Sequence, residues 1–261
     1  MKCWNPSFGV SGVVAVSTLL AAGAASAPAS QALIDFGASG TTTTTPDGSG
    51  RVWNNISSGN DLSGSPFSLL NTLGQDSSYK LTISNPPGVT NPIGFNGDNA
   101  NGTTAATGAA AGRNYPVTAT RDSVFGNTTT FSNNIVQAVR LTLSDLNPAE
   151  TYSFDFFASR VGAGGDNRET EYHIIGDNTD TSVFLNASEN HSNIVGVTGV
   201  SPNANNQIVI DIDRGPNNNN GSGFFYLNVL EINSVPEPGS VGVIAVLAVG
   251  LLSRRASRKS L

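Results

Sequence analysis

The chain has 261 residues with 13 Lys+Arg and 19 Asp+Glu, which gives a formal net charge of −6. An acidic protein without a basic stripe repels phosphate backbones, so the composition argues against nucleic acid as a partner. The single cysteine, Cys3, lies near the N-terminus, and the rest of the chain therefore has neither a disulfide nor a cysteine metal site.

The N-terminus has the layout of a secretory signal peptide. Lys2 precedes an apolar and small-residue stretch that runs from about Val10 to Ala25. We place the signal peptide at residues 1–32, because cleavage after Ala27 would leave Pro28 directly behind the cut. Residues 33–233 then hold 8 Lys+Arg and 18 Asp+Glu, a net charge of −10. A domain of that length buries about 70% of its extended surface and needs no disulfide.

Short runs of alternating apolar and polar residues, separated by Gly, Asn, Ser and Thr, predict an all-β domain. A turn at Asn147-Pro148 connects residues 136–143 and 151–158 into an expected hairpin. By contrast, residues 85–116 are predicted to form a long irregular region that is too polar to build core. We expect a single antiparallel β-sandwich of the jelly-roll type, with strands at residues 33–36, 51–56, 67–70, 79–84, 136–143, 151–158, 169–175, 181–185, 193–197, 207–213 and 224–232.

Residues 235–261 consist of three parts with different physical roles. Pro236 and Pro238 disfavour a helix and keep the chain extended around Glu237. The apolar run at residues 241–252 predicts a short C-terminal membrane helix of roughly 18 Å, against a hydrocarbon core of about 30 Å. The basic end at residues 254–259 should stay cytoplasmic, because cations resist crossing the bilayer; its charged residues are Arg254, Arg255, Arg258 and Lys259.

This order of parts resembles the PEP-CTERM sorting signal of bacteria, which an exosortase processes. The resemblance implies that Pro236, Glu237 and Pro238 form the sorting motif and that an exosortase and the secretion machinery are partners. It also implies a transient membrane insertion. A simple tail anchor and a soluble helix remain the alternatives for the tail. Together with the signal peptide, the tail predicts export to the cell envelope, the cell surface or the extracellular matrix.

Strand and turn segments across the domain form a second pattern, at residues 33–37 (LIDFG), 53–55 (WNN), 143–152 (LSDLNPAETY), 156–160 (FFASR), 166–170 (DNRET) and 223–227 (GFFYL). They resemble a bacterial secreted β-sandwich family of the galactose-binding-like, carbohydrate-binding-module kind. The resemblance implies the sandwich fold and favours surface polysaccharide as a ligand, but it locates no site.

Nucleophilic catalysis finds no support, because the chain has no Gly-x-Ser-x-Gly elbow and only two isolated histidines. A pair of carboxylates is the remaining enzymatic option. Asp166 precedes Glu169 and Glu171, which are two apart on an expected strand and share one face. The simpler interpretation is an exposed strand face that forms ion pairs with Arg160 and Arg168. We therefore predict no catalytic residues, and keep a two-carboxylate glycan-cleaving enzyme as an alternative.

Calcium is the cofactor that the loops favour. Carboxylate and amide oxygens in irregular segments suit a hard cation, although Asn and Asp also favour turns for conformational reasons. No spacing matches an EF-hand. The candidate ligands of a structural calcium are Asn96, Asp98, Asn99, Asp166 and Asn167.

Glycan binding would need an exposed aromatic ring flanked by amides, because the ring stacks on a sugar while the amides meet its hydroxyl groups. Trp53 with Asn54 and Asn55 is the best such group, and Tyr115 is the second. The apolar neighbours of Trp53 favour a core position instead. We predict an exported, non-catalytic surface or matrix protein, with a secreted carbohydrate-binding module as the first alternative.

Overall fold

The computed structural model describes residues 30–57, 65–90 and 92–236, which belong to the compact unit Ala27–Glu237. Strands make up 48% of the described residues, and their sheets are antiparallel except for one strand pair. The predicted antiparallel β-sandwich is thus confirmed at the level of fold class. Residues 1–29, Glu237, Pro238, the apolar run and the basic end lie outside the described residues. The last three residues of the expected signal peptide, at positions 30–32, belong to β1, where Ala32 is 0% exposed. Within the described part, no helix has the length and apolarity needed to span a bilayer.

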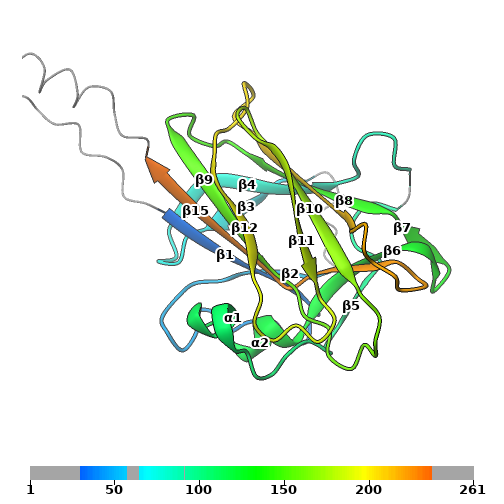
Figure 1. Cartoon of the computed structure of the whole chain (residues 1–261). Helices are drawn as coiled ribbons and strands as arrows, with labels where there is room; N and C mark the ends of the chain where they lie inside the picture. Colours follow the sequence, from blue (N-terminus) through cyan, green and yellow to red (C-terminus); the bar gives the residue numbers. More distant parts are fainter. Residues whose placement is uncertain (1–29, 58–64, 91, 237–261) are drawn as a thin grey trace, which may run out of the picture. The chain divides into compact units, whose positions relative to one another are not determined.

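Two large sheets form the layers of the sandwich (Figure 1). In the first, here called sheet A, β1 and β2 pair in parallel and the other neighbours pair antiparallel. Its spatial order is β12 (Val195–Val200), β9 (Glu150–Phe157), β15 (Val229–Pro236), β1 (Ser30–Gly37), β2 (Asn54–Ser57). The second, sheet B, is fully antiparallel, in the order β11 (Asp180–Asn186), β10 (Glu169–Ile175), β13 (Ile208–Arg214), β8 (Ala138–Ser144), β4 (Asp76–Ser84), β3 (Phe67–Leu70).

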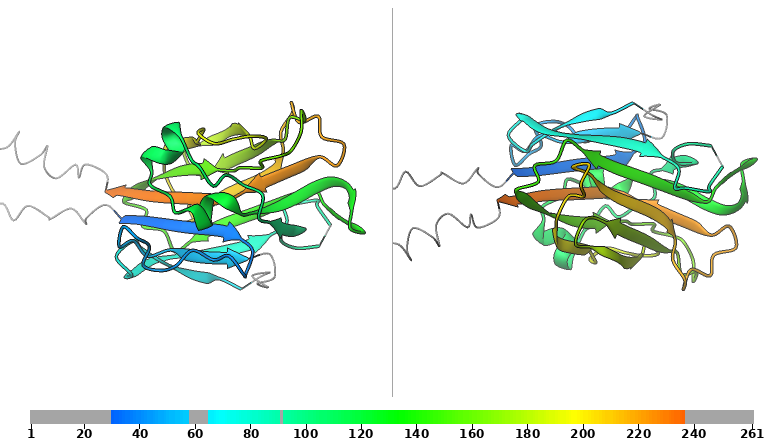
Figure 2. Two further views of the ribbon diagram at one scale, coloured as in Figure 1. Left: turned by 90° about the horizontal axis from the view of Figure 1, so that it is seen from below. Right: turned by 90° about the horizontal axis from the view of Figure 1, so that it is seen from above.

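A smaller sheet C and two short helices complete the described elements. Sheet C has the order β14 (Phe224–Leu227), β6 (Ser123–Phe131), β5 (Gly97–Asn99), and β7 (Asn134–Val136) pairs with β6. The helices are α1 (Gly108–Gly112) and α2 (Val117–Arg121). Figure 2 shows both helices in front of β1 and β15 in one view and behind them in the opposite view. They therefore lie on one side of sheet A.

The main core lies between sheets A and B and follows from the period-two alternation of their strands. Phe156 of β9 stacks on Tyr172 of β10, with ring centroids 4.3 Å apart and an interplanar angle of 12°. Tyr152 of β9 meets Tyr79 of β4 edge-to-face at 6.1 Å. These rings join the two sheets, and all four belong to one cluster of buried residues.

Sheet A is also covered on its outer face, by a second buried cluster. Leu33, Phe157 and Val229 point outward from three adjacent strands, and each is 0% exposed. Trp53, Ala110, Tyr115 and Ala119 of the covering segments pack on them. This arrangement explains why β1 and β15 have buried residues in succession, whereas the alternation of β9 ends only at its last residue, Phe157.

The hairpin expected from residues 136–143 and 151–158 is wrong. β8 pairs with β13 and β4 in sheet B, whereas β9 pairs with β12 and β15 in sheet A. Because Leu141 and Phe154 both enter the core between the sheets, the connection must cross from one layer to the other. The backbone N–H of Asn147 donates to the Tyr152 hydroxyl at 2.9 Å and holds this corner.

The last expected strand, residues 224–232, is in fact two strands that meet at Asn228. The Asn228 side chain is 0% exposed. Its Oδ1 accepts from the N–H of Ser159 at 2.8 Å, and its Nδ2 donates to the carbonyl of Thr120 at 3.1 Å. These bonds tie one buried amide to two segments that are distant in sequence. They hold in place the residue at which the chain leaves sheet C and enters sheet A.

The polar region at residues 85–116 does contribute to the core, contrary to expectation. It contains β5 and α1, and Ala110 and Tyr115 are 0% and 8% exposed in the outer cluster. Residues 117–135, which the sequence assigned to no element, contain α2 and β6. The small side chains of α1 let a short helix approach the sheet closely, which periodicity over five residues cannot reveal.

Phe156→Ala should destabilise the domain by about 3–5 kcal/mol, because it removes a fully buried ring and leaves a cavity between the sheets. Urea unfolding followed by near-ultraviolet circular dichroism measures the change. The control is Phe184→Ala, at a position that is 42% exposed on β11, where a cost below about 1 kcal/mol is expected. Equal costs at the two positions would contradict the assignment of Phe156 to the core.

Candidate ligand-binding site

An apolar cavity of about 220 Å³ lies against sheet C. Four of its lining residues are aromatic and come from two neighbouring strands, β6 and β14. We call it the Phe–Arg cavity, after the residues that line it, which are Asn99, Phe125, Phe131, Arg160, Arg168, Phe224 and Tyr226.

The aromatic wall follows from the alternation of β14. Phe224 and Tyr226 line the cavity, whereas Phe225, between them, is 0% exposed in the core. Gly126 of β6 makes room for that inward ring, since a Cβ there would lie 2.0 Å from the Cζ of Phe225. Across the pair, Phe131 and Phe224 pack edge-to-face at 4.9 Å. Phe131 is 40% exposed, so part of the wall faces solvent.

Two guanidinium groups border this wall. Arg168 lies 5.5 Å from the centroid of the Phe224 ring, and its Nη1 donates to the Tyr226 hydroxyl at 2.6 Å. Arg160 donates to the carbonyl of Val161 at 2.5 Å. Burial raises the pKa of Tyr226, while the charges of Arg168 and Arg160 act to lower it. Both cations therefore lie close to the same hydroxyl.

The positive charge at the cavity has little compensation from carboxylates. Asp166 is 3.8 Å from Arg168, a long ion pair, and the Asp166 side chain is 47% exposed. Among the described residues, Arg160 has no carboxylate within ion-pair distance. The Nε of Arg168 is buried and has no hydrogen-bond partner in the described part of the chain. In an acidic protein, two such cations beside aromatic rings form a local site for an electron-rich group.

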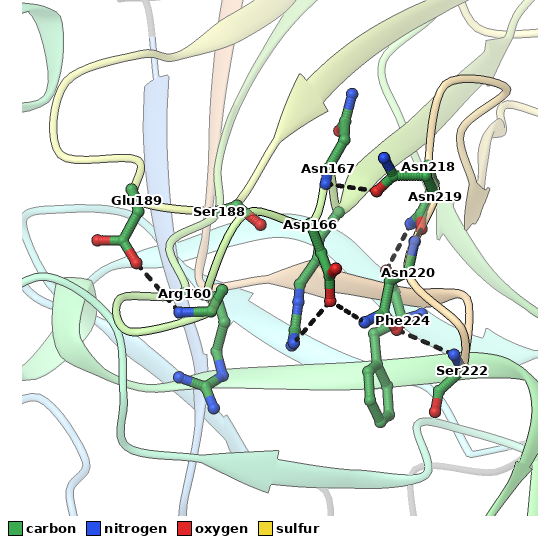
Figure 3. A network of polar contacts seen from close by, with 12 residues as sticks. Arg160, Asp166, Asn167, Ser188, Glu189, Asn218, Asn219, Asn220, Ser222 and Phe224 are labelled. Carbon is green, nitrogen blue, oxygen red and sulfur yellow. Dashed lines mark hydrogen bonds and ion pairs between the residues drawn. The ribbon is translucent and has the colours of Figure 1, made fainter.

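An asparagine-rich turn at residues 217–223 holds the aromatic wall in place (Figure 3). Asn218 is 2% exposed, and its Nδ2 donates to the carbonyls of Glu169 and Phe224 at 2.9 and 2.7 Å. Asn220 donates to Asp166 at 2.8 Å and accepts from the N–H of Ser222. The turn thus connects the start of β10 to the start of β14, and positions Phe224 at the cavity.

The structure separates the residues expected to bind calcium into two groups. Asn96, Asp98 and Asn99 lie at β5, where Asn96 donates to Asn127 at 2.6 Å and Asn99 to Ser123 at 2.8 Å. Asp166 and Asn167 contact the asparagine-rich turn instead; the N–H of Asn167 donates to Asn219 at 2.7 Å. No cluster of three or more His, Cys, Asp or Glu side chains suited to a metal occurs in the described residues. Calcium at these five residues stays a prediction.

The residues expected to contact glycan lie elsewhere. The sequence left two interpretations of Trp53 open, and the structure places it in the outer core, 3% exposed and 5.9 Å from Tyr115. Its Nε1 donates to Asp47 at 2.9 Å. Burial acts to raise the pKa of Asp47, but the hydrogen bonds from Trp53 and Arg51 lower it to about 2.

The side chains of Asn54 and Asn55 also form hydrogen bonds within the protein. Asn54 donates to the carbonyls of Leu33 and Leu70, and Asn55 donates to the carbonyl of Thr43. With Tyr115 bonded to Glu231 at 2.8 Å, none of the four residues presents a ring face and an amide together to solvent. Only Asn99, expected as a calcium ligand, lines the Phe–Arg cavity.

The three carboxylates of the enzymatic alternative are held by different partners. Glu169 is 9% exposed and accepts from the N–H and the side chain of Asn217. Glu171 accepts from the hydroxyl of Ser182 at 2.5 Å. Among the described residues, neither glutamate forms the expected ion pair with Arg160 or Arg168, because both arginines lie at the cavity.

Sequence reasoning missed the aromatic wall. The segments at residues 156–160, 166–170 and 223–227 were singled out, but only as a resemblance. Phe224, Phe225 and Tyr226 are consecutive aromatics, and the sequence alone does not say which of them leave the core. The register of β14 on β6 decides it, with Phe225 opposite Gly126.

No protein-family model matches the chain, and no curated protein matches it significantly. Among solved structures, it is similar to the Clostridium perfringens chain CpGH89CBM32-5 in complex with GalNAc-β-1,3-galactose, at 18% identity and a TM-score of 0.28, over 59% of this chain and 94% of that one. A panose complex of the isomalto-dextranase of Arthrobacter globiformis T6 follows at 13% identity and a TM-score of 0.26, over 64% and 22%. The enzymatically active domain of bacteriophage CBA120 tailspike protein 4 has 12% identity and a TM-score of 0.25, over 70% and 22%. These likenesses decide neither ligand nor activity.

Asn218→Ala should destabilise the domain by about 1–3 kcal/mol, because two buried carbonyls lose their donor. Urea unfolding of the variant measures the loss. Asn205→Ala, at an exposed turn position, should change the stability by less than about 0.5 kcal/mol. A neutral Asn218 variant would show that the turn does not hold β14 in place.

Proposed function

We propose that the chain is an exported surface or matrix protein whose β-sandwich binds carbohydrate without catalysis, at the Phe–Arg cavity. The supporting observation is the combination of four aromatic rings with two guanidinium groups and the Asn99 amide around one opening. Aromatic rings favour the C–H faces of a sugar ring, and guanidinium and amide groups donate to its oxygens. The cavity, at about 220 Å³, is smaller than the roughly 300–1,000 Å³ of sites for drug-sized ligands. It suits a single sugar unit of a longer chain.

The charge of the cavity favours an acidic saccharide. Both cations point to one small region, and the nearest carboxylate, Asp166, is largely exposed and 3.8 Å away from Arg168. A carboxylate or sulfate group on the sugar could accept paired hydrogen bonds from a guanidinium, which are stronger than bonds from neutral donors. Because residues 33–233 have a net charge of −10, two weakly compensated cations distinguish the cavity from the acidic surface of the domain.

A glycan-cleaving enzyme is the less favoured alternative. Hydrolysis with two carboxylates needs one acid and one base on opposite sides of the scissile bond, about 5–10 Å apart. The cavity is lined by no carboxylate, and Asp166, at its border, is bonded to Asn220. Release of reducing ends from a bound polysaccharide would favour the enzyme over the binding module.

Export rests on the two ends of the chain. The signal peptide at residues 1–32 and the PEP-CTERM-like tail at residues 235–261 agree on a passage across the membrane, and the resemblance of the tail alone adds processing by an exosortase. Retention at the cell surface would then place the sandwich where it meets surface polysaccharide. A structural matrix protein without a ligand shares this route and differs only in the binding test.

Arg160→Gln should weaken binding of an acidic oligosaccharide, such as oligogalacturonate, by about tenfold, because a charged hydrogen bond of roughly 1.5 kcal/mol is lost. Isothermal titration calorimetry with the full chain measures the affinity. Lys80→Gln removes the same charge at an exposed residue paired with Asp145, and should leave binding unchanged. The neutral oligosaccharide maltohexaose should bind more weakly than the acidic one. If neither saccharide binds, the proposed function fails.

Glu237→Ala should leave a longer, membrane-held precursor in the native host, because it changes the sorting motif without altering the apolar run or the cations. A simple tail anchor would be indifferent to this substitution. The measurement is the intact mass of the surface protein. Detection of a mature wild-type form that still carries residues 241–259 would reject exosortase sorting.

A further inference from the structure

We propose that Asp35 and Asp122 together bind a calcium ion on the outer face of sheet A, beneath the loop at residues 38–43. This site is separate from the Phe–Arg cavity and from the residues that the sequence favoured for calcium. It rests on two buried carboxylates, each with one oxygen that has no hydrogen-bond partner among the described residues.

Asp35 lies on β1, between β15 and β2 of sheet A, and is 2% exposed. Its Oδ2 accepts from the N–H of Thr43 at 2.9 Å. Its Oδ1 is buried and has no hydrogen-bond partner within the described residues. Burying a carboxylate oxygen without a hydrogen-bond donor or a cation costs free energy, and a bound cation would remove this cost.

Asp122 follows α2 and is 0% exposed. Its Oδ2 accepts from the N–H of Ala38 at 3.0 Å and from the hydroxyl of Thr41. Its Oδ1 is likewise buried without a partner in the part of the chain that the structure describes. In each aspartate, Oδ2 accepts hydrogen bonds from the loop at residues 38–43, and Oδ1 accepts none in the described residues.

The two carboxylates are neighbours because of Gly37. A Cβ at Gly37 would lie 2.2 Å from the Oδ2 of Asp122, so the Asp122 carboxylate occupies the place of a Gly37 side chain. Residues two apart on a strand point to the same face, which puts Asp35 beside that place. Burial and the nearby charge of Asp122 raise the pKa of Asp35 to about 7. Two adjacent buried anions require either a shared proton or a cation.

The surrounding chemistry favours a hard cation. The oxygens at the site belong to carboxylates, to the hydroxyls of Thr41 and Thr43 and to the amide of Asn55, which accepts from the N–H of Thr43. Calcium prefers six to eight oxygen ligands of these kinds, including backbone carbonyls and water. Arg121 is the cation that acts on Asp122 from α2, but no hydrogen bond joins the two side chains in the described structure.

Glu231 provides an internal comparison on the same face of sheet A. It is also 2% exposed, yet it is satisfied by Arg113 at 3.0 Å, Tyr115 at 2.8 Å and Gln31 at 2.8 Å. The protein therefore neutralises one buried carboxylate with its own cation and donors. At Asp35 and Asp122, by contrast, no guanidinium donates a hydrogen bond to either carboxylate in the described residues, and one oxygen of each is left without a partner that a bound ion would supply.

The experiment compares the full-length chain with and without calcium. Elemental analysis after dialysis against micromolar calcium should find one calcium per chain. Excess chelator should lower the melting temperature by about 5–10 °C, since an ion that binds only the folded state stabilises it by mass action. Calcium should restore the melting temperature, and magnesium should not, because it demands a tighter octahedral shell.

Two sets of variants assign the ion to its residues. Asp122→Asn and Asp35→Asn keep the size of the side chains and remove the repulsion, so each variant should fold, lose the bound calcium and melt at one temperature with or without chelator. The matched control, Asp98→Asn with Asp166→Asn, should retain both the ion and the response to chelator. Calcium dependence that survives in Asp122→Asn, or is lost in the control, would overturn the assignment.

A shared proton is the competing explanation for the pair. A carboxyl whose pKa is raised in the folded state binds protons more readily than in the unfolded state, so its contribution to stability falls as the pH rises from about 4 to about 7. Such a loss, found in a wild-type chain that holds no calcium and ignores chelator, would replace the ion with a proton and overturn the proposal.

Discussion

The structure depends on the burial of sheet A on both faces. Sheet B covers one face, and α1, α2 and the chain from residue 38 to residue 53 cover the other. Apolar residues gain from this, but polar side chains beneath the covering segments lose their water. Glu231, Asp35 and Asn55 all point there, and residues of the covering segments bond to each of them. Arg113 and Tyr115 meet Glu231, and the loop at residues 38–43 meets Asp35.

The same constraint explains how much of the fold the sequence reveals. Strands covered on one face, such as β4 and β10, alternate cleanly and were located to within a few residues. Which strands pair could not be predicted in the same way, because pairing depends on the sheet in which each strand lies. Nothing local in residues 136–158 distinguishes a hairpin from a crossing between layers; the Tyr152 hydroxyl and the opposing core rings make that choice. The break at Asn228 also depends on two segments remote in sequence.

Side-chain roles were harder to predict than strands, since exposure is set by tertiary contacts. Trp53 and the amides beside it have the composition of a sugar site, yet Trp53 packs in the outer core with its Nε1 bonded to Asp47, and Asn54 donates to the carbonyl of Leu33. Phe224 and Tyr226 have the composition of core, yet they line a cavity. Gly126 leaves room for the Phe225 ring in the core. Because side chains alternate along β14, Phe224 and Tyr226 then face the cavity. A single small residue on the neighbouring strand thus decides where the aromatic wall forms.

The topology also relates the proposed binding site to the proposed sorting tail. β15 runs from Val229, directly after the cavity strand β14, to Pro236 at the start of the expected sorting motif. Seven steps of about 3.3 Å put roughly 23 Å between the two ends of this strand. Ser30 of β1 pairs with Ser234, so the N-terminal end of the described chain lies at the Pro236 end too. A chain held at the cell surface through residues beyond Pro236 would therefore carry the Phe–Arg cavity at the far end of β15, where a long polysaccharide could reach it.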